Sequence, residues 1–358
     1  MAAASDTPQI LTHIAHSVTY TVFDTKWVPR SARAVGVGQT ARGRGIIQVY
    51  SLGKKGTLQV EAETGKAAGF KCATFAASAL EDRFLATGDF SGRLAVWDLD
   101  HPELPVYAAS AHDGIVNAID GIGGVLGAGA PEIVTGGRDG VAKVWDTRQK
   151  NEPVLALKPA AGSDTRDCWA VAFGNAYSDE ERTVVTGYDN GDVKMFDLRM
   201  SKLVWETNVA NGVCHLAFDR PDIEMNKLYV STLESKLRVY DMRTFSEDLG
   251  YAHVTHADSD CTVWRSAPLP QDRDVFMAAY GNGSLSLCKY KYPDKRSETD
   301  AQGKPVGVAG SVIPLASASI STQPIHCFDW SADKRGLCVF GSFDQCIRVG
   351  IVTRLEVV

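Results

Sequence analysis

The chain has 358 residues, of which 44% are apolar and 22% charged, with 33 glycines and a formal net charge of −6. This ordinary soluble composition provides enough apolar residues for a large core, and the glycines suit many tight turns. The acidic balance argues against broad nucleic-acid binding, and no window approaches the roughly 18 consecutive apolar residues that span a bilayer.

Residues 1–8 are expected to form a flexible N-terminus. They lack the basic start and apolar centre of a signal peptide. The eight cysteines of the chain contain no C-x-x-C pair, and most of them fall in expected strands. We therefore expect reduced cysteines, no metal, no cofactor, no membrane association and a location in the cytoplasm.

A hairpin pattern recurs along the chain and is most complete at residues 133–148, IVTGGRDGVAKVWDTR. An apolar strand, an Arg-Asp-Gly turn and an alternating strand predict a β-hairpin, and its closing Trp-Asp pair is typical of a propeller blade. The aligned closing positions are Tyr50, Trp97, Trp145, Phe196, Tyr240, Cys288 and Gly350. Their spacing is 44 to 51 residues, except for a last step of 62, against roughly 40–45 residues per four-stranded blade. The pattern predicts an all-β, seven-bladed propeller.

An apolar strand precedes each copy and is expected to be the inner strand of its blade, beside the central channel. These strands are Val22–Trp27, Phe70–Phe75, Ile115–Ile119, Trp169–Phe173, Val213–Phe218, Val263–Ala267 and Ile325–Trp330. The run Gln9–His13 comes before the first of them. We expect it to be the outer strand of the last blade, beside Ile347–Val352, closing residues 9–358 into a single monomeric domain.

The third blade carries a set of polar residues at positions that define the repeat: His112, Thr135, Asp139 and Trp145. The Asp carboxylate can accept a hydrogen bond from the His ring, and the other ring nitrogen can form a hydrogen bond with the Thr hydroxyl. The hydroxyl can in turn accept a hydrogen bond from the Trp indole N–H. A hydrolase site is disfavoured because Thr135 lies on an expected strand and not at a nucleophile elbow. The set predicts a buried network that makes the blade rigid.

The long last step of the repeat comes from a polar, aperiodic segment with Pro and Gly around residues 291–312. Such a segment is expected to be a flexible insertion in the sixth blade.

One rim of the propeller, built from inner-strand starts and hairpin turns, is the expected protein-binding face. Aromatic and Arg side chains are typical interface anchors. The repeat alignment places these residues on the rim: Lys71, Phe90, Arg138, Asp167, Trp264, His326 and Phe343.

Longer stretches resemble Monad-type WD-repeat proteins, a dynein axonemal assembly factor family. The stretches include RDCWAVAFGNAY, GYDNGDVKMFDLR, NGVCHLAFDR and PIHCFDWSADKRGLCVFGSFDQCIRV, and the likeness runs from TVFDTKWVP to the C-terminus. The resemblance implies a scaffold that helps preassemble axonemal dynein arms in the cytoplasm, with the cilium or flagellum as a further location. It also implies axonemal dynein chains as partners, together with a co-chaperone complex of RuvB-like ATPases and a ninety-kilodalton heat-shock chaperone.

Two other functions compete with this non-catalytic adaptor. A peptide- or chromatin-reading propeller unrelated to dynein would need a strongly charged pocket, whereas the charges are scattered. A propeller enzyme with a central metal would need converging carboxylates or histidines on the inner strands. The candidates for that role, His215, His326 and Asp329, lie in different blades. We therefore expect no catalysis and no nucleic-acid partner.

Overall fold

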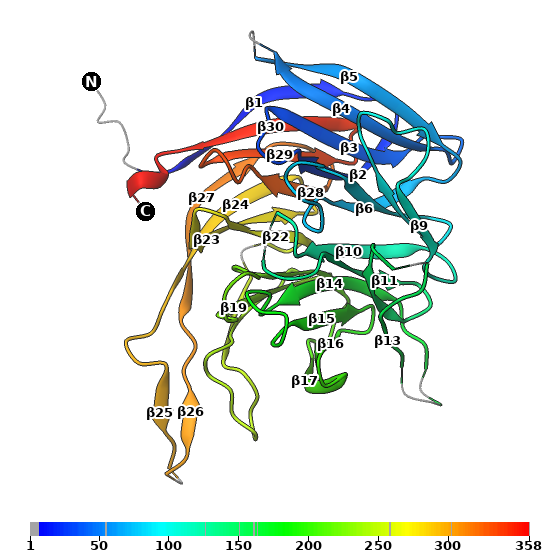
Figure 1. Ribbon diagram of the computed structural model, residues 1–358. Helices are drawn as coiled ribbons and strands as arrows, with labels where there is room; N and C mark the ends of the chain where they lie inside the picture. The colour runs from blue at the N-terminus through cyan, green and yellow to red at the C-terminus, as the bar shows by residue number, and fades with distance from the viewer. Residues whose placement is uncertain are drawn as a thin grey trace, which may run out of the picture.

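The computed structural model describes residues 7–357 apart from 54–55, 126, 150, 160–161, 163, 258 and 302. The described residues form seven four-stranded antiparallel sheets around a central channel, plus one two-stranded sheet (Figure 1). The all-β propeller expected from the repeat spacing is confirmed. Residues 1–6 of the predicted flexible N-terminus lie outside the described part of the chain. No described helix is long and apolar enough to cross a membrane.

The first three blades follow the chain from inner to outer strand. Blade 1 comprises β2 (Thr21–Trp27), β3 (Arg33–Gln39), β4 (Gly45–Gly53) and β5 (Thr57–Lys66). Blade 2 comprises β6 (Phe70–Thr74), β7 (Leu85–Asp89), β8 (Arg93–Trp97) and β9 (Tyr107–Ser110). Blade 3 comprises β10 (Val116–Ile122), β11 (Glu132–Gly137), β12 (Ala142–Asp146) and β13 (Leu155–Leu157).

Blades 4 to 6 repeat the same order. Blade 4 comprises β14 (Cys168–Gly174), β15 (Thr183–Tyr188), β16 (Asp192–Asp197) and β17 (Lys202–Asn208). Blade 5 comprises β18 (Val213–Phe218), β19 (Lys227–Thr232), β20 (Leu237–Asp241) and β21 (His253–His256). Blade 6 comprises β22 (Val263–Leu269), β23 (Asp272–Tyr280), β24 (Ser284–Lys291) and β27 (Ser311–Ser319).

Blade 7 joins the two ends of the chain. It comprises β28 (Ile325–Trp330), β29 (Leu337–Ser342), β30 (Cys346–Thr353) and the N-terminal β1 (Gln9–Ser17). The register runs from Gln9 opposite Thr353 to Ser17 opposite Cys346. The predicted closure by residues 9–13 is confirmed, and the closing strand extends further, to Ser17. A short 3-10 helix, η1 (Leu355–Val357), follows β30.

The core consists of apolar layers between neighbouring blades. One buried cluster combines Ile47 of blade 1 with Phe70 and Trp97 of blade 2, and another combines Val185 of blade 4 with Leu228 of blade 5. Fully burying one such side chain stabilises the fold by about 1.5–3 kcal/mol. Because every blade contributes to two layers, the ring holds the inner strands rigidly around the channel.

The insertion in blade 6 contains regular structure. Strands β25 (Ser297–Thr299) and β26 (Pro305–Gly307) pair as a hairpin that projects from the body at the lower left of Figure 1. The sequence predicted a flexible loop here because three-residue strands are too short to show periodicity. The flexibility of the segment stays a prediction.

Candidate protein-binding mouth of the central channel

Every inner strand in the described ring carries an irregularity near its start. Near the start of each inner strand, the pairing register with the next strand shifts and leaves one residue without a direct partner; β22 has a second shift near its end. A bulge of this kind bends a strand and redirects a side chain. The residues at the shifts are Phe23, Lys71, Asn117, Trp169, Cys214, Trp264 and His326, and all of them line the channel. The channel cavity measures about 530 Å³.

Aromatic rings gather on one side of this opening, in blades 1, 2, 6 and 7. We call this cluster the aromatic mouth: Phe23, Phe90, Trp264, His326 and Phe343. The His326 ring stacks on Phe343 with centroids 3.9 Å apart and planes 5° apart. Phe23 lies 5.1 Å from Phe90, and Trp264 lies 6.3 Å from Phe343. The ammonium group of Lys71 lies 5.1 Å from the Phe23 ring centroid, a cation–π contact.

The aromatic mouth is only partly covered by protein. Phe343 is 36% exposed, and Leu233, on the far side of the opening, is also 36% exposed. A partly exposed aromatic cluster around a concave opening can receive an apolar side chain of a partner.

Charged groups lie deeper in the channel, and the structure gives each of them a partner. The Asp24 carboxylate pairs with Lys26 at 2.8 Å and with Arg265 at 3.5 Å. It also accepts the backbone N–H of Ala73 in blade 2 at 3.1 Å. Burial alone would raise the pKa of Asp24, but Lys26 and Arg265 bring it below its ordinary value. This carboxylate therefore stays charged and ties blade 1 to blade 2.

Two further carboxylates link neighbouring blades in the same way. Asp120 accepts the N–H of Phe173 at 2.9 Å, and Asp329 accepts the N–H of Trp27 at 2.8 Å. Burial raises the pKa of both carboxyl groups, to about 6 for Asp120. These contacts give the channel carboxylates a structural role in holding the inner strands together.

The two histidines considered for a central metal, His215 and His326, both have lowered pKa values. His326 bonds the Val22 carbonyl oxygen through Nε2 at 2.7 Å, and burial lowers its pKa to about 4. Burial likewise lowers the pKa of His215 well below its ordinary value. Within the described residues, no group of three or more His, Cys, Asp or Glu side chains is arranged to hold a metal ion.

Comparison with known proteins gives a match along the whole chain. Residues 104–146 match the family described as WD domain, G-beta repeat. The chain is 55% identical over 355 residues to dynein axonemal assembly factor 10 of Homo sapiens, covering 99% of each protein. It is 52% identical over 351 residues to dynein axonemal assembly factor 10 of Chlamydomonas reinhardtii, covering 98% of each. The chain belongs to the dynein axonemal assembly factor 10 family. The matching length spans all seven blades, so membership concerns the entire propeller.

In this member of the family, most of the rim residues expected from the sequence lie together. Lys71, Phe90, Trp264, His326 and Phe343 meet in or beside the aromatic mouth. Their role in binding stays a prediction.

Two expected rim residues lie elsewhere on the ring. Arg138 is exposed in the turn between β11 and β12, and Asp167 precedes β14. Neither makes a ring contact with the aromatic mouth within the described residues.

Sequence reasoning missed five side chains of the opening: Phe23, Asn117, Trp169, Cys214 and Leu233. Phe23 and Trp169 occupy the same repeat position as Lys71 and Trp264. Aligning the inner strands residue by residue would therefore have found them.

The polar set of blade 3 forms a continuous chain of hydrogen bonds. His112 Nδ1 lies 2.9 Å from Asp139 Oδ1, and His112 Nε2 lies 2.7 Å from Thr135 Oγ1. Trp145 Nε1 donates to Thr135 Oγ1 at 2.9 Å. Because a carboxylate only accepts, Nδ1 carries the imidazole proton and Nε2 accepts from the threonine hydroxyl. Gly137 is required beside this chain, since a Cβ there would lie 2.3 Å from the His112 ring.

Proposed function

We propose that this chain is a non-catalytic adaptor for the cytoplasmic preassembly of axonemal dynein arms, and that it docks a partner at the aromatic mouth. The proposal rests on one observation: over nearly its whole length, the chain is 52% to 55% identical to proteins named dynein axonemal assembly factor 10. The specific partners that we propose are axonemal dynein chains and a co-chaperone complex of RuvB-like ATPases and a ninety-kilodalton heat-shock chaperone.

The geometry of the mouth supports docking by an anchor side chain. Stacked rings are held in place by the rigid inner strands, so little conformational entropy is lost when a partner binds. Lys71 provides a positive charge beside the apolar centre, as in protein interfaces with a polar rim, and Arg138 and Asp167 provide polar groups further around the ring. A loop of a dynein chain or chaperone subunit that presents an apolar residue would suit this surface.

The cysteines agree with a reducing compartment. All eight are free, and five of them are buried. Buried thiols of this kind pack as small apolar side chains. This supports the cytoplasm as the place of action, with the cilium or flagellum as a further location.

The docking surface is tested with the double variant Arg138→Glu/Phe343→Ala. Truncating an anchor typically costs about 2 kcal/mol or more in binding, roughly thirty-fold in Kd. We expect weaker capture of dynein chains and chaperone subunits in pull-downs, with an unchanged melting temperature. The control is Arg199→Glu/Tyr177→Ala, which makes the same charge change and also truncates an aromatic ring, at exposed positions in blade 4. Equal capture by both double variants would refute docking at the mouth.

The cellular role is tested by removing the protein from ciliated or flagellated cells. We expect axonemes poor in dynein arms, rescued by the wild-type chain and less well by the mouth variant. Normal dynein arms in such cells would leave the propeller intact and defeat the proposed function. Purified protein is expected to show no turnover of nucleotides, esters or phosphoesters.

A further inference from the structure

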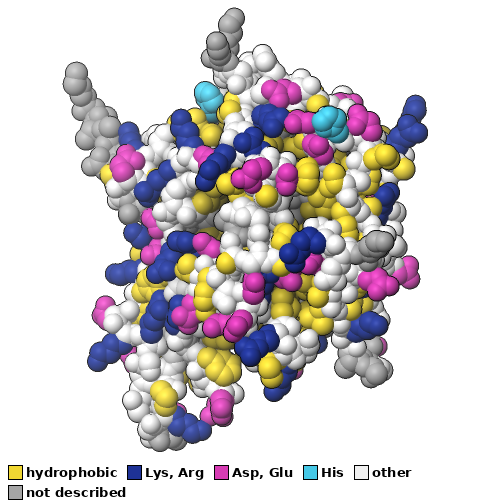
Figure 2. Space-filling model, in the orientation of Figure 1, with side chains coloured by type: hydrophobic (Ala, Val, Ile, Leu, Met, Phe, Trp, Pro, Cys, Tyr) yellow, Lys and Arg dark blue, Asp and Glu magenta, His cyan; other side chains and the backbone are white. Residues whose placement is uncertain are grey.

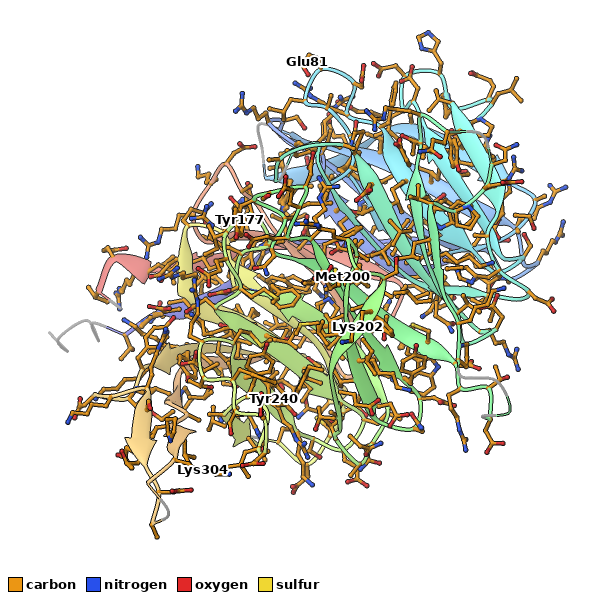
Figure 3. All side chains as sticks on the ribbon, turned by 60° about the horizontal axis from the view of Figure 1, so that its bottom comes forward. Glu81, Tyr177, Met200, Lys202, Tyr240 and Lys304 are labelled. Atoms are coloured by element: carbon orange, nitrogen blue, oxygen red, sulfur yellow. The ribbon has the colours of Figure 1, made fainter. Side chains whose placement is uncertain are left out.

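The insertion in blade 6 is attached to blade 5 by specific contacts. Arg296 Nε lies 3.1 Å from the Asp241 carboxylate, and Lys304 Nζ lies 2.7 Å from Asp248. Gly307 approaches Thr244 so closely that a Cβ would lie 2.6 Å from that side chain. Figure 3 shows Lys304 on the projecting hairpin and Tyr240 in the neighbouring blade 5. The insertion thus forms one wall of a groove shared with blade 5.

The groove, which we call the arginine groove, is an open cleft of about 690 Å³. It lies at the end of the strands opposite the aromatic mouth, because β23 begins and β20 ends there. Its lining residues are Glu224, Asn226, Met242, Arg243, Phe245, Arg273 and Arg296. Three guanidinium groups therefore converge from a turn, a strand and the insertion.

Two of these guanidinium groups are fixed by neighbours. Arg296 forms an ion pair with Asp241 and donates a hydrogen bond to the Asn226 side-chain oxygen at 3.0 Å. Its guanidinium lies 4.5 Å from the Tyr292 ring centroid. Arg243 pairs with the exposed Glu224. Because guanidinium groups donate hydrogen bonds and never accept them, the groove has more donors than acceptors.

Arg273 is different. It is exposed at the start of β23, and its guanidinium makes no hydrogen bond or ion pair with the described residues. The carboxylates on either side of it are already engaged. Asp272 pairs with Arg335 at 3.5 Å, and Asp274 pairs with the buried Lys227 at 2.8 Å. Arg273 acts on Asp274 through charge alone, so an incoming carboxylate would meet guanidinium donors that hold no hydrogen bond or ion pair among the described residues.

The floor under the groove is rigid. Lys227 is completely buried and lies 3.1 Å from Asp219, in addition to its pair with Asp274. The Tyr292 hydroxyl bonds Asp274 at 2.9 Å and accepts from Asn226 at 2.8 Å. A satisfied buried network of this kind holds the arginines above it in fixed positions, which reduces the entropic cost of binding.

One wall of the groove is apolar. Phe245 is 53% exposed and lies 5.1 Å from the Tyr251 ring. Nearby in the same turn, Leu249 is 70% exposed. Exposed apolar side chains next to arginines favour a polypeptide that offers both carboxylates and an apolar residue.

We propose that the arginine groove binds an acidic, extended segment of a partner protein. Carboxylates of the segment pair with Arg273 and Arg243, and an apolar side chain packs against Phe245. A nucleic acid is disfavoured because it needs a continuous basic surface, whereas the Lys and Arg side chains are interspersed with Asp and Glu over the face seen in Figure 2. A short acidic segment needs only the arginines of the groove. The groove does not depend on the aromatic mouth or on the identity of the partner docked there.

The test uses a fluorescein-labelled peptide of about ten Asp and Glu residues around one central Leu, titrated with the full chain. We expect saturable binding that weakens with added salt and is lost when Asn and Gln replace the acidic residues. Arg273→Glu should weaken binding by about tenfold or more, because hydrogen bonds to charged groups contribute about 1.5–3 kcal/mol each. Phe245→Ala should weaken it as well.

The matched control is Arg199→Glu. It makes the same charge change at an exposed arginine of blade 4 that pairs with Glu180 at 3.6 Å. An equal loss in this control would show a general charge effect and overturn the proposal. The proposal would also be overturned if the neutral peptide or oligouridine bound as tightly as the acidic peptide. The mouth variant Arg138→Glu/Phe343→Ala should bind the acidic peptide normally, which separates this test from that of the proposed function.

Discussion

At the scale of single residues, blade 3 depends on the carboxylate of Asp139. Its Oδ1 contacts His112 Nδ1 at 2.9 Å and accepts the Val141 N–H at 3.1 Å, while the His112 side chain is fully buried. In Asp139→Ala, a buried imidazole N–H would have no acceptor, so we expect a loss of ~1–3 kcal/mol in the free energy of unfolding.

Trp145→Ala should cost more, ~3–5 kcal/mol, since it removes a large buried ring as well as a network partner. Urea unfolding measures both losses, and Asp113→Ala, at an exposed carboxylate beside His112, serves as the control. Equal stability of Asp139→Ala and the parent chain would refute the network.

Blade 7 has a different carboxylate at its hairpin turn. Asp344 accepts from Ser342 at 2.6 Å and from Ser321 at 2.9 Å, and it pairs with Arg348. Burial alone would raise the pKa of Asp344. The hydrogen bonds from Arg348 and the two serines outweigh burial and hold this pKa well below its usual range.

Because the pKa of Asp344 is lower in the folded than in the unfolded chain, its stabilisation is complete above the ordinary aspartate value of about 3.9. It disappears as the pH falls toward the folded value. Asp344→Asn should therefore be less stable than the parent at neutral pH and lose less stability between about pH 5 and pH 2. Melting temperatures across this range measure the effect, with exposed Asp333→Asn as control. Parallel acid profiles for parent and Asp344→Asn would contradict the assignment.

At the scale of elements, β1 closes the ring by pairing with β30 along its whole length. Removing residues through His13 should uncover an edge of β30, lower the melting temperature and cause association at high concentration. A chain that lacks only residues 1–6 retains all of β1 and is the control. Sedimentation and thermal melts measure both effects. A monomeric truncated chain with an unchanged melting temperature would show that β1 is not needed for closure.

The inner strands and the closing strand were predictable because their signals are local. Each inner strand is a short apolar run before a hairpin, and the repeat spacing supplies the order of the blades. The hairpin β25–β26 was not predictable, since it is held by contacts with a different blade, such as that between Lys304 and Asp248.

The two proposed binding sites also differ in how local their sequence signals are. Five of the rim residues could be placed near the mouth from the repeat alone, and Phe23 and Trp169 could have been added because they occupy the same repeat position, at the bulge of their inner strands. The arginine groove had no signal in the sequence. Arg243, Arg273 and Arg296 come from two blades and an insertion, and the packing of blade 6 and its insertion against blade 5 brings them together.

At the scale of the whole molecule, the two proposed surfaces lie at opposite ends of the strands. The mouth is built from inner-strand starts and from turns such as that holding Phe343, whereas Arg273 and Arg243 lie where β23 begins and β20 ends. Sites this far apart with no shared side chains are expected to contribute independently to binding, within about 0.5 kcal/mol. An adaptor with two independent faces can hold two partners at once.

We therefore expect Arg273→Glu to release the acidic peptide while keeping the partner captured at the mouth, and Arg138→Glu/Phe343→Ala to do the reverse. The variant that combines all three changes should lose both peptide binding and partner capture. Each of these two losses should equal the loss measured in the corresponding separate variant. Peptide titration and pull-down on the same preparations give the two values. If the mouth variant also released the peptide while its melting temperature was unchanged, the two surfaces would be coupled through the ring and the independence of the faces would be wrong.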